Sequence, residues 1–328
     1  MVSMKKVAAA ASVSVGTVSN VLNAPEKVAP ATVARVQAAI EQLGFVRNDA
    51  ARQLKAGRSH CVGLVVLDIG NPFFSDIARA AEARAAEKGL VVLLGSTDDD
   101  AERERQYLET FDQQRVFGLL VSPASDDLGR LRALRERGVP VVLVDRDGRE
   151  TPFSSVTVDD VAGGRLAVEH LLRSGRRRLV FLGGPLSLHQ VAGRLAGARA
   201  AIGEFDGATL EVVPTPAPTV LAGRRAADAL LAEGFRPDAI FCANDLLAIG
   251  VLQSLITQGV AVPADIALIG YDDIDFASSA LVPLSSIRQP SARIGATAID
   301  LLVGAAGGAP TENVCYQPTL VERASTIG

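Results

Sequence analysis

The first 44 residues carry apolar side chains at the spacing of short amphipathic helices. We predict a first helix over about 5–11 and a second over about 15–22, where the Ser14 hydroxyl can accept from unpaired backbone N–H groups of the first turn. A third helix starts near Pro30 and stops at Gly44. Two short helices joined by a tight turn and supported by a third indicate a helix-turn-helix fold.

The second predicted helix has two faces of different character. At the periodicity of an α-helix, one face collects the apolar side chains of Val18, Val21 and Leu22. The opposite face collects Val15, Gly16, Ser19 and Asn20. We therefore expect the first face to pack inside the domain and the second face to be free to contact a partner.

A weaker helical pattern covers 49–56 and is closed by Gly57. A helix of about two turns is marginal in water on its own, so we expect it to form only with a partner.

From residue 61 onward, short apolar runs alternate with alanine-rich amphipathic stretches. The runs predict strands at 61–67, 90–95, 117–121, 140–144, 178–182, 239–242 and 266–270. The stretches predict helices such as 74–88, 101–114, 161–174 and 245–258. Nearly continuous apolar strands alternating with helices indicate α/β architecture, with parallel sheets covered on both faces. About 270 residues exceed one comfortable core, which favours two doubly wound subdomains.

Charge divides the chain at about residue 58. The 328 residues have a net charge of −4, but residues 1–58 contain eight Lys or Arg and three acidic residues, a net charge of +5. The remainder has a net charge of −9. A basic first part on an acidic second part favours nucleic-acid binding by the first. Charge alone leaves open chance variation of the surface.

The longest apolar runs, 63–67 and 89–95, are far shorter than the roughly 20 residues that cross a bilayer. The first residues lack the apolar stretch and cleavage site of a signal peptide, so we expect a cytoplasmic protein with no membrane partner. Cys61, Cys242 and Cys315 each lie in an apolar run and are expected to be buried thiols, because three widely spaced cysteines fit neither a disulfide framework nor a zinc site.

Motifs of enzymes are absent from the sequence. No two glycines stand two positions apart, which excludes the G-x-G-x-x-G dinucleotide fingerprint, and no phosphate-binding loop of the form G-x-x-x-x-G-K-[ST] occurs. The three histidines are far apart, and there is no G-x-S-x-G nucleophile motif. We therefore expect no enzymatic activity, no cofactor and no metal.

Polar side chains instead follow the predicted strands, at the edge where doubly wound sheets bind ligands. These residues are Asp68, Asn71, Ser122, Asp145, Arg146, Asn244, Asp245, Asp272 and Asp273. Arg194 lies beyond the loop that begins at Gly183-Gly184. Carboxylates, an amide and a guanidinium suit a polyhydroxylated or zwitterionic small ligand. Helix capping is the alternative role for Asn244, Asp245 and Asp273.

Seven segments carry a resemblance to a known family. They are VSVGTVSNVLN at 13–23, NDAARQLKAGRS at 48–59, GLVVLDIGNPFF at 63–74, GVPVVLVDR at 138–146, AND at 243–245, DIALIGYDD at 265–273 and LVER at 320–323. In this order and spacing the chain resembles the lactose-repressor (LacI/GalR) family of bacterial transcription regulators over essentially its whole length. Ser12 and Ala29 depart from the pattern, since a turn glycine and a capping serine are usual there.

The resemblance implies how DNA is bound. The second helix would enter the major groove with Val15, Gly16 and Asn20 at base edges. Ser14, Thr17 and Ser19 would hold phosphates rather than read bases, and Asn23 would be a further DNA contact of this head. The 49–56 element would be a hinge helix in which Arg52 and Lys55 also contact DNA. Leu54 would wedge between central base pairs in the minor groove, a simple dimer contact being the alternative.

For the rest of the chain the resemblance implies a periplasmic-binding-protein-like clamp with an effector between its subdomains. Arg194, Asn244 and Asp272 would hold the effector. The other predicted wall residues are Asp68, Phe73, Phe74, Ser122 and Asp145. The implied domains are a head at 1–46, a hinge at 47–59 and an effector-binding and dimerisation core at 60–328, whose subdomains interleave with crossings near 160, 290 and 320.

Together these observations predict a sequence-specific transcriptional regulator, expected to be a repressor, whose affinity for operator DNA is controlled by a small molecule. We expect a sugar or sugar derivative, with a purine or other non-sugar effector as the alternative. The expected partners are a near-palindromic double-stranded operator and a second copy of the chain in a homodimer, which two dimers could extend to a tetramer. A solute-binding protein without a DNA role is disfavoured, since it needs a signal peptide and no basic head.

Overall fold

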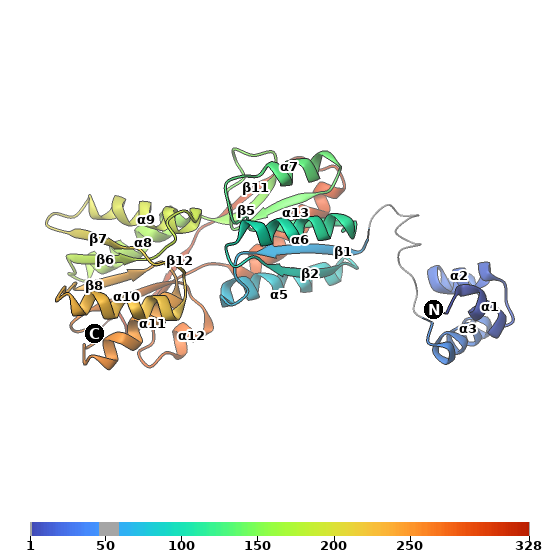
Figure 1. Cartoon of the computed structure of the whole chain (residues 1–328), viewed down its shortest axis with the longest axis horizontal. Helices are drawn as coiled ribbons and strands as arrows, with labels where there is room; N and C mark the ends of the chain where they lie inside the picture. The colour runs from blue at the N-terminus through green and yellow to red at the C-terminus, as the bar shows by residue number, and fades with distance from the viewer. Residues whose placement is uncertain (1, 46–58, 328) are drawn as a thin grey trace. The chain divides into compact units, whose positions relative to one another are not determined.

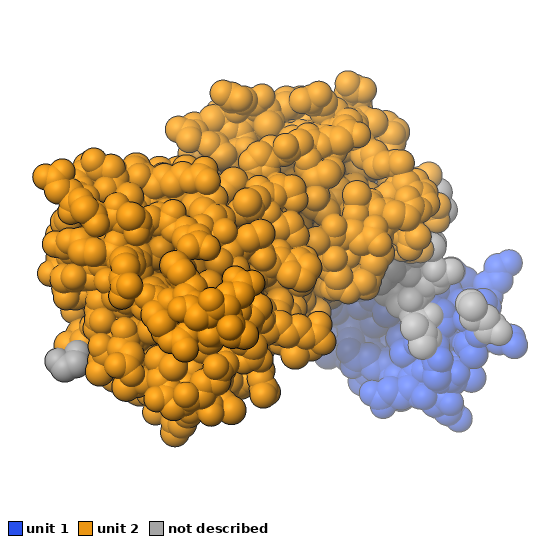
Figure 2. Space-filling view, turned by 60° about the vertical axis from the view of Figure 1, so that its left-hand side comes forward, with its two compact units in different colours: residues 1–59 blue, residues 60–328 orange. Residues whose placement is uncertain are grey.

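The computed structural model describes residues 2–45 and 59–327. The chain forms two compact units, residues 1–59 and residues 60–328, which Figure 2 shows in blue and orange. Among the described residues, no helix is both long and apolar enough to cross a membrane.

Unit 1 contains the predicted helix-turn-helix. Its helices are α1 (Met4–Ala10), α2 (Val15–Asn23), the short 3-10 helix η1 (Pro25–Lys27) and α3 (Pro30–Leu43). One fully buried valine from each α-helix, Val7, Val18 and Val36, meets in a small core. The three predicted helices are therefore confirmed, with ends that differ from the prediction by one residue at most.

Backbone conformation separates α1 from α2 and ends α3. Ser12 lies between the first two helices with φ 53°, in the left-handed region that favours glycine. Two residues later, the Ser14 hydroxyl accepts from the Thr17 N–H at 3.0 Å and caps α2 as predicted. Gly44 ends α3 with φ 58°. Ala29 precedes α3 with no side-chain cap.

Unit 2 is built on two six-stranded sheets, shown in Figure 1. The strands of the first sheet are β1 (Cys61–Val66), β2 (Val91–Ser96), β3 (Gly118–Val121), β4 (Val141–Val144), β5 (Ser154–Val158) and β11 (Asn313–Tyr316). All pair in parallel in the order β11-β5-β4-β3-β1-β2. Because side chains alternate along a strand, Leu64 and Val66 pack with one group of helices and Val65 with another.

Two pairs of helices cover the two faces of the first sheet. The pair α5 (Pro72–Glu87) and α13 (Ser291–Ala306) packs on the face that bears Leu64. The pair α6 (Ala101–Gln113) and α7 (Gly129–Glu136) packs on the face that bears Val65. The first sheet is therefore doubly wound, as the alternating pattern predicted.

The second sheet repeats this plan. Its strands are β6 (Arg178–Leu182), β7 (Thr209–Val213), β8 (Ala239–Cys242), β9 (Ala267–Asp272), β10 (Ser285–Arg288) and β12 (Thr319–Val321). They follow the order β12-β10-β9-β8-β6-β7, and only β12 is antiparallel to its neighbour. Its helices are α8 (Asp160–Arg173), α9 (His189–Ile202), α10 (Val220–Ala232), α11 (Asp245–Thr257) and the short α12 (Asp275–Ser279). Helices α8 and α9 pack together, as do α10 and α11, on opposite sides of the sheet in Figure 1.

The chain passes between the two sheets three times. It leaves β5 for α8 at residue 159, leaves β10 for α13 at residues 289–290, and leaves β11 for β12 at residues 317–318. The fold class, a helix-turn-helix head with a core of two doubly wound subdomains, is confirmed.

Two expectations need correction. The sequence patterns missed the strands β5, β7, β10, β11 and β12, which are short, polar or at a sheet edge. Cys242 is buried as expected, but Cys61 is only partly buried and Cys315 is exposed. Cys315 lies on β11, an edge strand of the first sheet, so one side of this strand faces solvent.

The two serines of the turn before α2 should respond to substitution with opposite signs. Ser12→Gly removes a left-handed non-glycine residue and should stabilise unit 1 by up to about 1 kcal/mol, net of the extra chain entropy of glycine. Ser14→Ala removes a helix cap and should destabilise it by about 1 kcal/mol. Amide hydrogen exchange in α1 and α2 of the full chain should slow in the first variant and accelerate in the second. Faster exchange in Ser12→Gly would contradict the assigned backbone strain.

Candidate functional site

Helix α2 presents one face to solvent, as its periodicity predicted. Val15 is 40% exposed although it is apolar, and Gly16 and Asn20 are exposed beside it. On the opposite face Val18 and Val21 are buried. An exposed valine next to a glycine and an amide is a surface able to approach another molecule closely, with one apolar and one hydrogen-bonding group.

The predicted phosphate-binding hydroxyls lie at the same end of α2 or along it. The Ser14 and Thr17 hydroxyls are 2.9 Å apart, at the N-terminus of the helix, where the helix dipole favours an anion. Further along, the Asn23 amide donates to the Ser19 carbonyl oxygen at 2.8 Å. The remaining residues predicted to contact DNA, Arg52, Leu54 and Lys55, lie outside the described residues, as does the predicted 49–56 helix.

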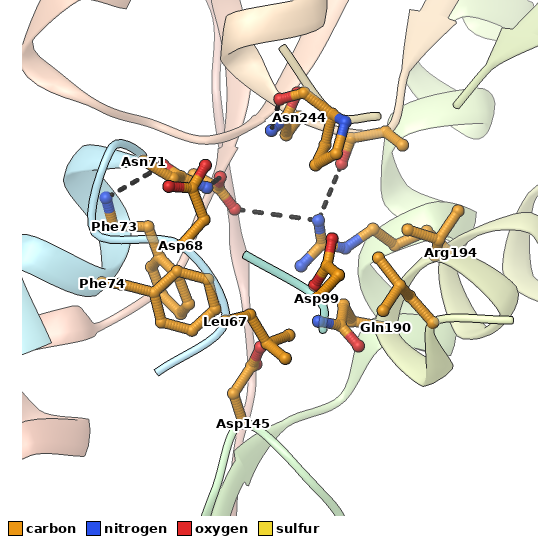
Figure 3. A pocket seen from close by; sticks show the side chains of 15 residues that line it. Leu67, Asp68, Asn71, Phe73, Phe74, Asp99, Asp145, Gln190, Arg194 and Asn244 are labelled. Atoms are coloured by element: carbon orange, nitrogen blue, oxygen red, sulfur yellow. Dashed lines mark hydrogen bonds and ion pairs between the residues drawn. The ribbon is translucent and has the colours of Figure 1, made fainter. Parts of the chain in front are cut away.

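In unit 2 a pocket opens where the carboxyl ends of strands from both sheets meet. Figure 3 shows Arg194 reaching into it from one side and the rings of Phe73 and Phe74 on the other. The lining residues are Leu67, Asp68, Asn71, Phe73, Phe74, Asp99, Asp145, Leu188, Gln190, Val191, Arg194, Pro218, Ala243, Asn244 and Asp272. Seven of the eight predicted effector residues are among them. The eighth, Ser122, donates its hydroxyl to the Val144 carbonyl oxygen and lines an adjoining pocket that shares Asp145.

Arg194 is the buried cation of this pocket, with only 5% of its side chain exposed. Its Nε donates to Asp160 Oδ1 at 2.8 Å, and its Nη1 donates to the Ala243 carbonyl oxygen at 2.7 Å. Nη1 also lies 3.8 Å from Asp272 Oδ1, and the guanidinium stacks 3.7 Å from the centre of the Tyr271 ring. Burial alone would lower the pKa of Arg194, but these neighbouring carboxylates raise it, so the side chain stays charged.

The packing of α8 on α9 sets the position of Arg194. A Cβ atom on Gly164 would lie 2.0 Å from the Arg194 carbonyl oxygen, and one on Gly197 would lie 1.9 Å from the Val161 carbonyl oxygen. Only glycine lets the two helix backbones approach this closely. This contact brings Asp160, in the first turn of α8, within hydrogen-bonding distance of the Arg194 side chain.

Asn71 and Asp272 join the two sheets across the pocket. The Asn71 Oδ1 accepts from the Phe73 N–H at 3.1 Å and caps α5, while its Nδ2 donates to Asp272 Oδ2 at 3.1 Å. The other carboxylate oxygen of Asp272 accepts from Gln289 Nε2 at 2.7 Å. Asp272 at the end of β9 therefore receives donors from α5 of the first subdomain and from the segment that leads to α13.

Asn244 caps a helix, the role left open as an alternative. Its Oδ1 accepts from the Leu247 N–H at 2.9 Å at the start of α11, and its Nδ2 donates to the Pro218 carbonyl oxygen at 3.0 Å. Its neighbour Asp245 lies outside the pocket and holds the Ile274 N–H and the Ser286 hydroxyl.

Two further aspartates complete the pocket. Both Asp99 and Asp145 have a buried Oδ1 without a hydrogen-bond partner, and both have positive φ. Burial raises the pKa of Asp99 to about 6, with a further increase from the charges of Asp68 and Asp98. Burial likewise raises the pKa of Asp145 well above its usual range, and the charge of Asp160 adds to this increase.

Three polar lining residues are absent from the predicted effector-binding residues. Asn71 was named only as a polar residue that follows a strand, and Asp99 and Gln190 were not named. Asp99 follows β2 at the same sheet edge as Asp68, so the rule that selected residues after predicted strands could have found it. Gln190 lies in the first turn of α9 after a long loop, where no local pattern marks it.

Comparisons with known proteins match a family to each of the two units. The family described as bacterial regulatory proteins, lacI family, matches residues 3–48, and the periplasmic binding protein-like domain matches residues 168–326. The ribose operon repressor of Escherichia coli K12 is 35% identical over 92% of each chain, and the transcriptional repressor PurR of Escherichia coli O1:K1 is 32% identical over 99% of this chain and 97% of PurR. A crystal structure of the lac repressor dimer bound to operator and the anti-inducer ONPF is 29% identical over 100% of this chain and 99% of that chain, with a TM-score of 0.86.

Substitution of Asp99 should change how stability depends on pH. Because its pKa in the folded chain is raised to about 6, Asp99 favours folding most below pH of about 4, and this contribution is lost as pH rises through 6. Asp99→Asn should therefore increase the free energy of unfolding by about 1 kcal/mol at pH 8, and this increase should become smaller toward pH 5. The value allows for the partial exposure of the side chain, which weakens the effect of its charge.

Urea unfolding of the full chain at pH 5 to 8 measures this difference. Asp76→Asn is the control, since Asp76 is a partly exposed aspartate on α5 that pairs with Arg79 and is not among the charges that raise the pKa of Asp99. A gain that is the same at every pH, or equal in the two variants, would argue against a buried carboxylate at Asp99.

Proposed function

The chain belongs to the lacI family of bacterial regulatory proteins, and we propose that a small sugar bound between the two sheets of unit 2 controls its affinity for operator DNA. It is a DNA-binding transcriptional regulator and not an enzyme. We propose that it represses transcription and acts in the cytoplasm, where bacterial DNA is located.

The exposed face of α2 supports its placement in the major groove. Val15 is suited to a thymine methyl group, Gly16 to close backbone approach, and Asn20 to a bidentate contact with adenine. Ser14, Thr17, Ser19 and Asn23 would contact phosphates and so fix the register of the helix on the duplex. In the hinge, Arg52 and Lys55 would contact DNA and Leu54 would insert into the minor groove.

A homodimer is the proposed DNA-binding form. The edge strand β2 carries three exposed aliphatic side chains, Val91, Leu93 and Leu94, at 58%, 38% and 43% exposure. An exposed apolar edge strand is unfavourable in a monomer and suits association with a second copy. The lac repressor, which is similar over the whole chain, is a dimer on its operator. Two heads related by twofold symmetry imply a near-palindromic site with half-sites about one helical turn apart.

The balance of hydrogen-bonding groups in the pocket favours a sugar. Four of the eight polar residues that the structure describes in the lining are aspartates, and two of these have an oxygen atom without a partner. Hydroxyl groups of a sugar donate to such acceptors, while its C–H faces pack on the Phe73 and Phe74 side. The similarity to ribose operon repressors points to a pentose.

A purine is the second candidate effector, favoured by the similarity to PurR over nearly the whole chain. The two phenylalanine rings meet edge to face, with centroids 5.1 Å apart and planes at 64°. This arrangement offers a flat ring a stacking surface on one side only.

The effector would act by changing how the two sheets are held together. Asn71 and Asp272 connect the two subdomains at the pocket, and Arg194 lies 3.8 Å from Asp272, so a ligand that binds there changes the balance between open and closed arrangements. A ligand shifts DNA affinity only through its different affinity for the two arrangements, typically about 1–3 kcal/mol of coupling.

Thermal unfolding of the full chain with pentoses, hexoses and purine bases tests the effector class, because a ligand that binds the folded state raises its stability. Stabilisation by a sugar, together with a change in DNA affinity in the presence of that sugar, is the expected result. Stabilisation by hypoxanthine or guanine and by no sugar would replace the sugar proposal with the purine alternative.

Substitutions in unit 1 separate base reading from phosphate contact. Sites selected by the protein from a pool of random duplexes should be near-palindromic. Asn20→Ala should weaken binding to them by about 1–3 kcal/mol and relax the preference at one base position, with non-specific affinity unchanged. Lys27→Ala, at an exposed position in η1, should weaken specific and non-specific binding equally and reduce the salt dependence. Equal base preferences in Asn20→Ala and the parent would remove Asn20 from the base-reading set.

A further inference from the structure

We propose that the pocket admits an uncharged effector and rejects anionic derivatives of the same molecule, with Asp145 as the main residue that enforces this selection. This proposal rests on the effector role of the pocket proposed above and adds the charge class of the ligand.

The fixed charges around the pocket are predominantly negative. Among the described residues that line it, four are aspartates, Asp68, Asp99, Asp145 and Asp272, and one is a cation, Arg194. The charge of Arg194 is already balanced, because Asp160 lies 2.8 Å away behind the pocket wall and Asp272 lies 3.8 Å away. A phosphate or carboxylate on the ligand would therefore meet an excess of like charge in a partly desolvated site.

Two helix N-termini at the pocket, which could otherwise bind an anion, are occupied by side chains of the protein. At α5 the Asn71 amide oxygen accepts from the Phe73 N–H, and at α11 the Asn244 amide oxygen accepts from the Leu247 N–H. At these two backbone N–H groups, a neutral amide oxygen of the protein is therefore the acceptor, in place of an oxygen atom of an anionic ligand.

The N-terminus of α9 has no side-chain cap, and Asp145 stands near it. The residues that line both the main pocket and the adjoining pocket include Leu188, Gln190 and Asp145. Leu188 directly precedes α9, and Gln190 lies in its first turn. Asp145 places a carboxyl group in the part of the cleft where the α9 dipole would attract an anion. Arg146, which lines the adjoining pocket, pairs through Nη2 with Asp126 at 3.0 Å, while its Nη1 has no hydrogen-bond partner within the described part of the chain.

The geometry of Asp145 gives it one free acceptor. It is 94% buried, since its exposed fraction is 6%, and its Oδ1 has no hydrogen-bond partner. A buried acceptor without a partner is stabilised by a ligand O–H or N–H donor and destabilised by a second oxyanion. Burial already raises the pKa of Asp145, so an added negative charge is especially unfavourable there.

Matched pairs of neutral and anionic compounds test the selection on the full chain at pH 8. Suitable pairs are D-ribose with D-ribose 5-phosphate, D-galactose with D-galacturonate, D-glucose with D-glucuronate, and hypoxanthine with inosine 5′-monophosphate. Titration calorimetry gives the ratio of the Kd of the anionic member to that of the neutral member. We expect at least about a tenfold preference for the neutral member of the pair that binds. An anionic member that binds as tightly as its neutral partner, or tighter, would overturn the proposal.

The pairs also separate this proposal from the proposed sugar effector. If only hypoxanthine binds, the sugar proposal fails, and the base and its monophosphate then test the charge selection by themselves. If a sugar phosphate or uronate binds better than the neutral sugar, the sugar proposal stands and the charge selection fails.

Variants assign the selection to Asp145. Asp145→Asn keeps the side-chain shape and tolerates φ 57°, and it should reduce the Kd ratio by about tenfold. Asp68→Asn, which keeps the acceptor for the Gly70 N–H, is a second variant expected to change the ratio in the same direction. Asp76→Asn removes a charge from α5 outside the pocket, and should leave the ratio unchanged. An unchanged ratio in Asp145→Asn would remove Asp145 from this role.

Discussion

The buried guanidinium of Arg194 is the interaction on which the ligand pocket depends. Desolvating a cation is costly, and it is offset here by Asp160 on α8, the Ala243 carbonyl oxygen after β8, the Tyr271 ring on β9 and the more distant Asp272. These partners come from α8, the end of β8 and β9, so three parts of the second subdomain are held in position relative to Arg194. Groups of the protein itself therefore fix the position of Arg194, and loss of the guanidinium would leave buried carboxylates without a counter-charge.

The residues that face the ligand also maintain the fold. Asn71 caps α5 with its amide oxygen and donates its amide N–H to Asp272. Asn244 caps α11 in the same way and donates to the Pro218 carbonyl oxygen. A helix cap contributes about 1 kcal/mol, comparable to one hydrogen bond to a ligand. Substitutions at these two positions therefore change stability and ligand binding together, whereas Asp145, which has a free oxygen atom, is better suited to separating them.

The sequence alone could predict the elements in which side-chain periodicity and burial coincide. The helices of unit 1 and the apolar strands β1, β4, β6 and β8 belong to this class. By contrast, β5 and β10 are buried although they contain serines. Ser155 bonds with Asn313, and Ser286 donates to Asp245, so hydrogen bonds to residues distant in sequence satisfy these hydroxyls. No local pattern contains that information.

The same distinction applies to the pocket. Side chains that directly follow predicted strands, such as Asp68, Asp145 and Asp272, were predicted because parallel strands end at one edge. Ser122 follows the same rule, yet it bonds back to Val144 and lines the adjoining pocket. That Arg194 is held by Asp160 could not be predicted, because it depends on the close approach of α8 and α9 through Gly164 and Gly197. Positions along strands were thus predictable, and contacts between helices were not.

The hydrogen bond between Asn71 and Asp272 also limits how an effector can act. It joins the two subdomains through side chains of the protein itself, so it contributes part of the energy that holds the cleft together. A ligand that only replaced this bond with an equivalent one would leave the equilibrium between arrangements unchanged, however tightly it bound. The regulatory effect must therefore come from contacts added to it, and the acceptors without partners on Asp99 and Asp145 are where the described pocket still has such contacts to make.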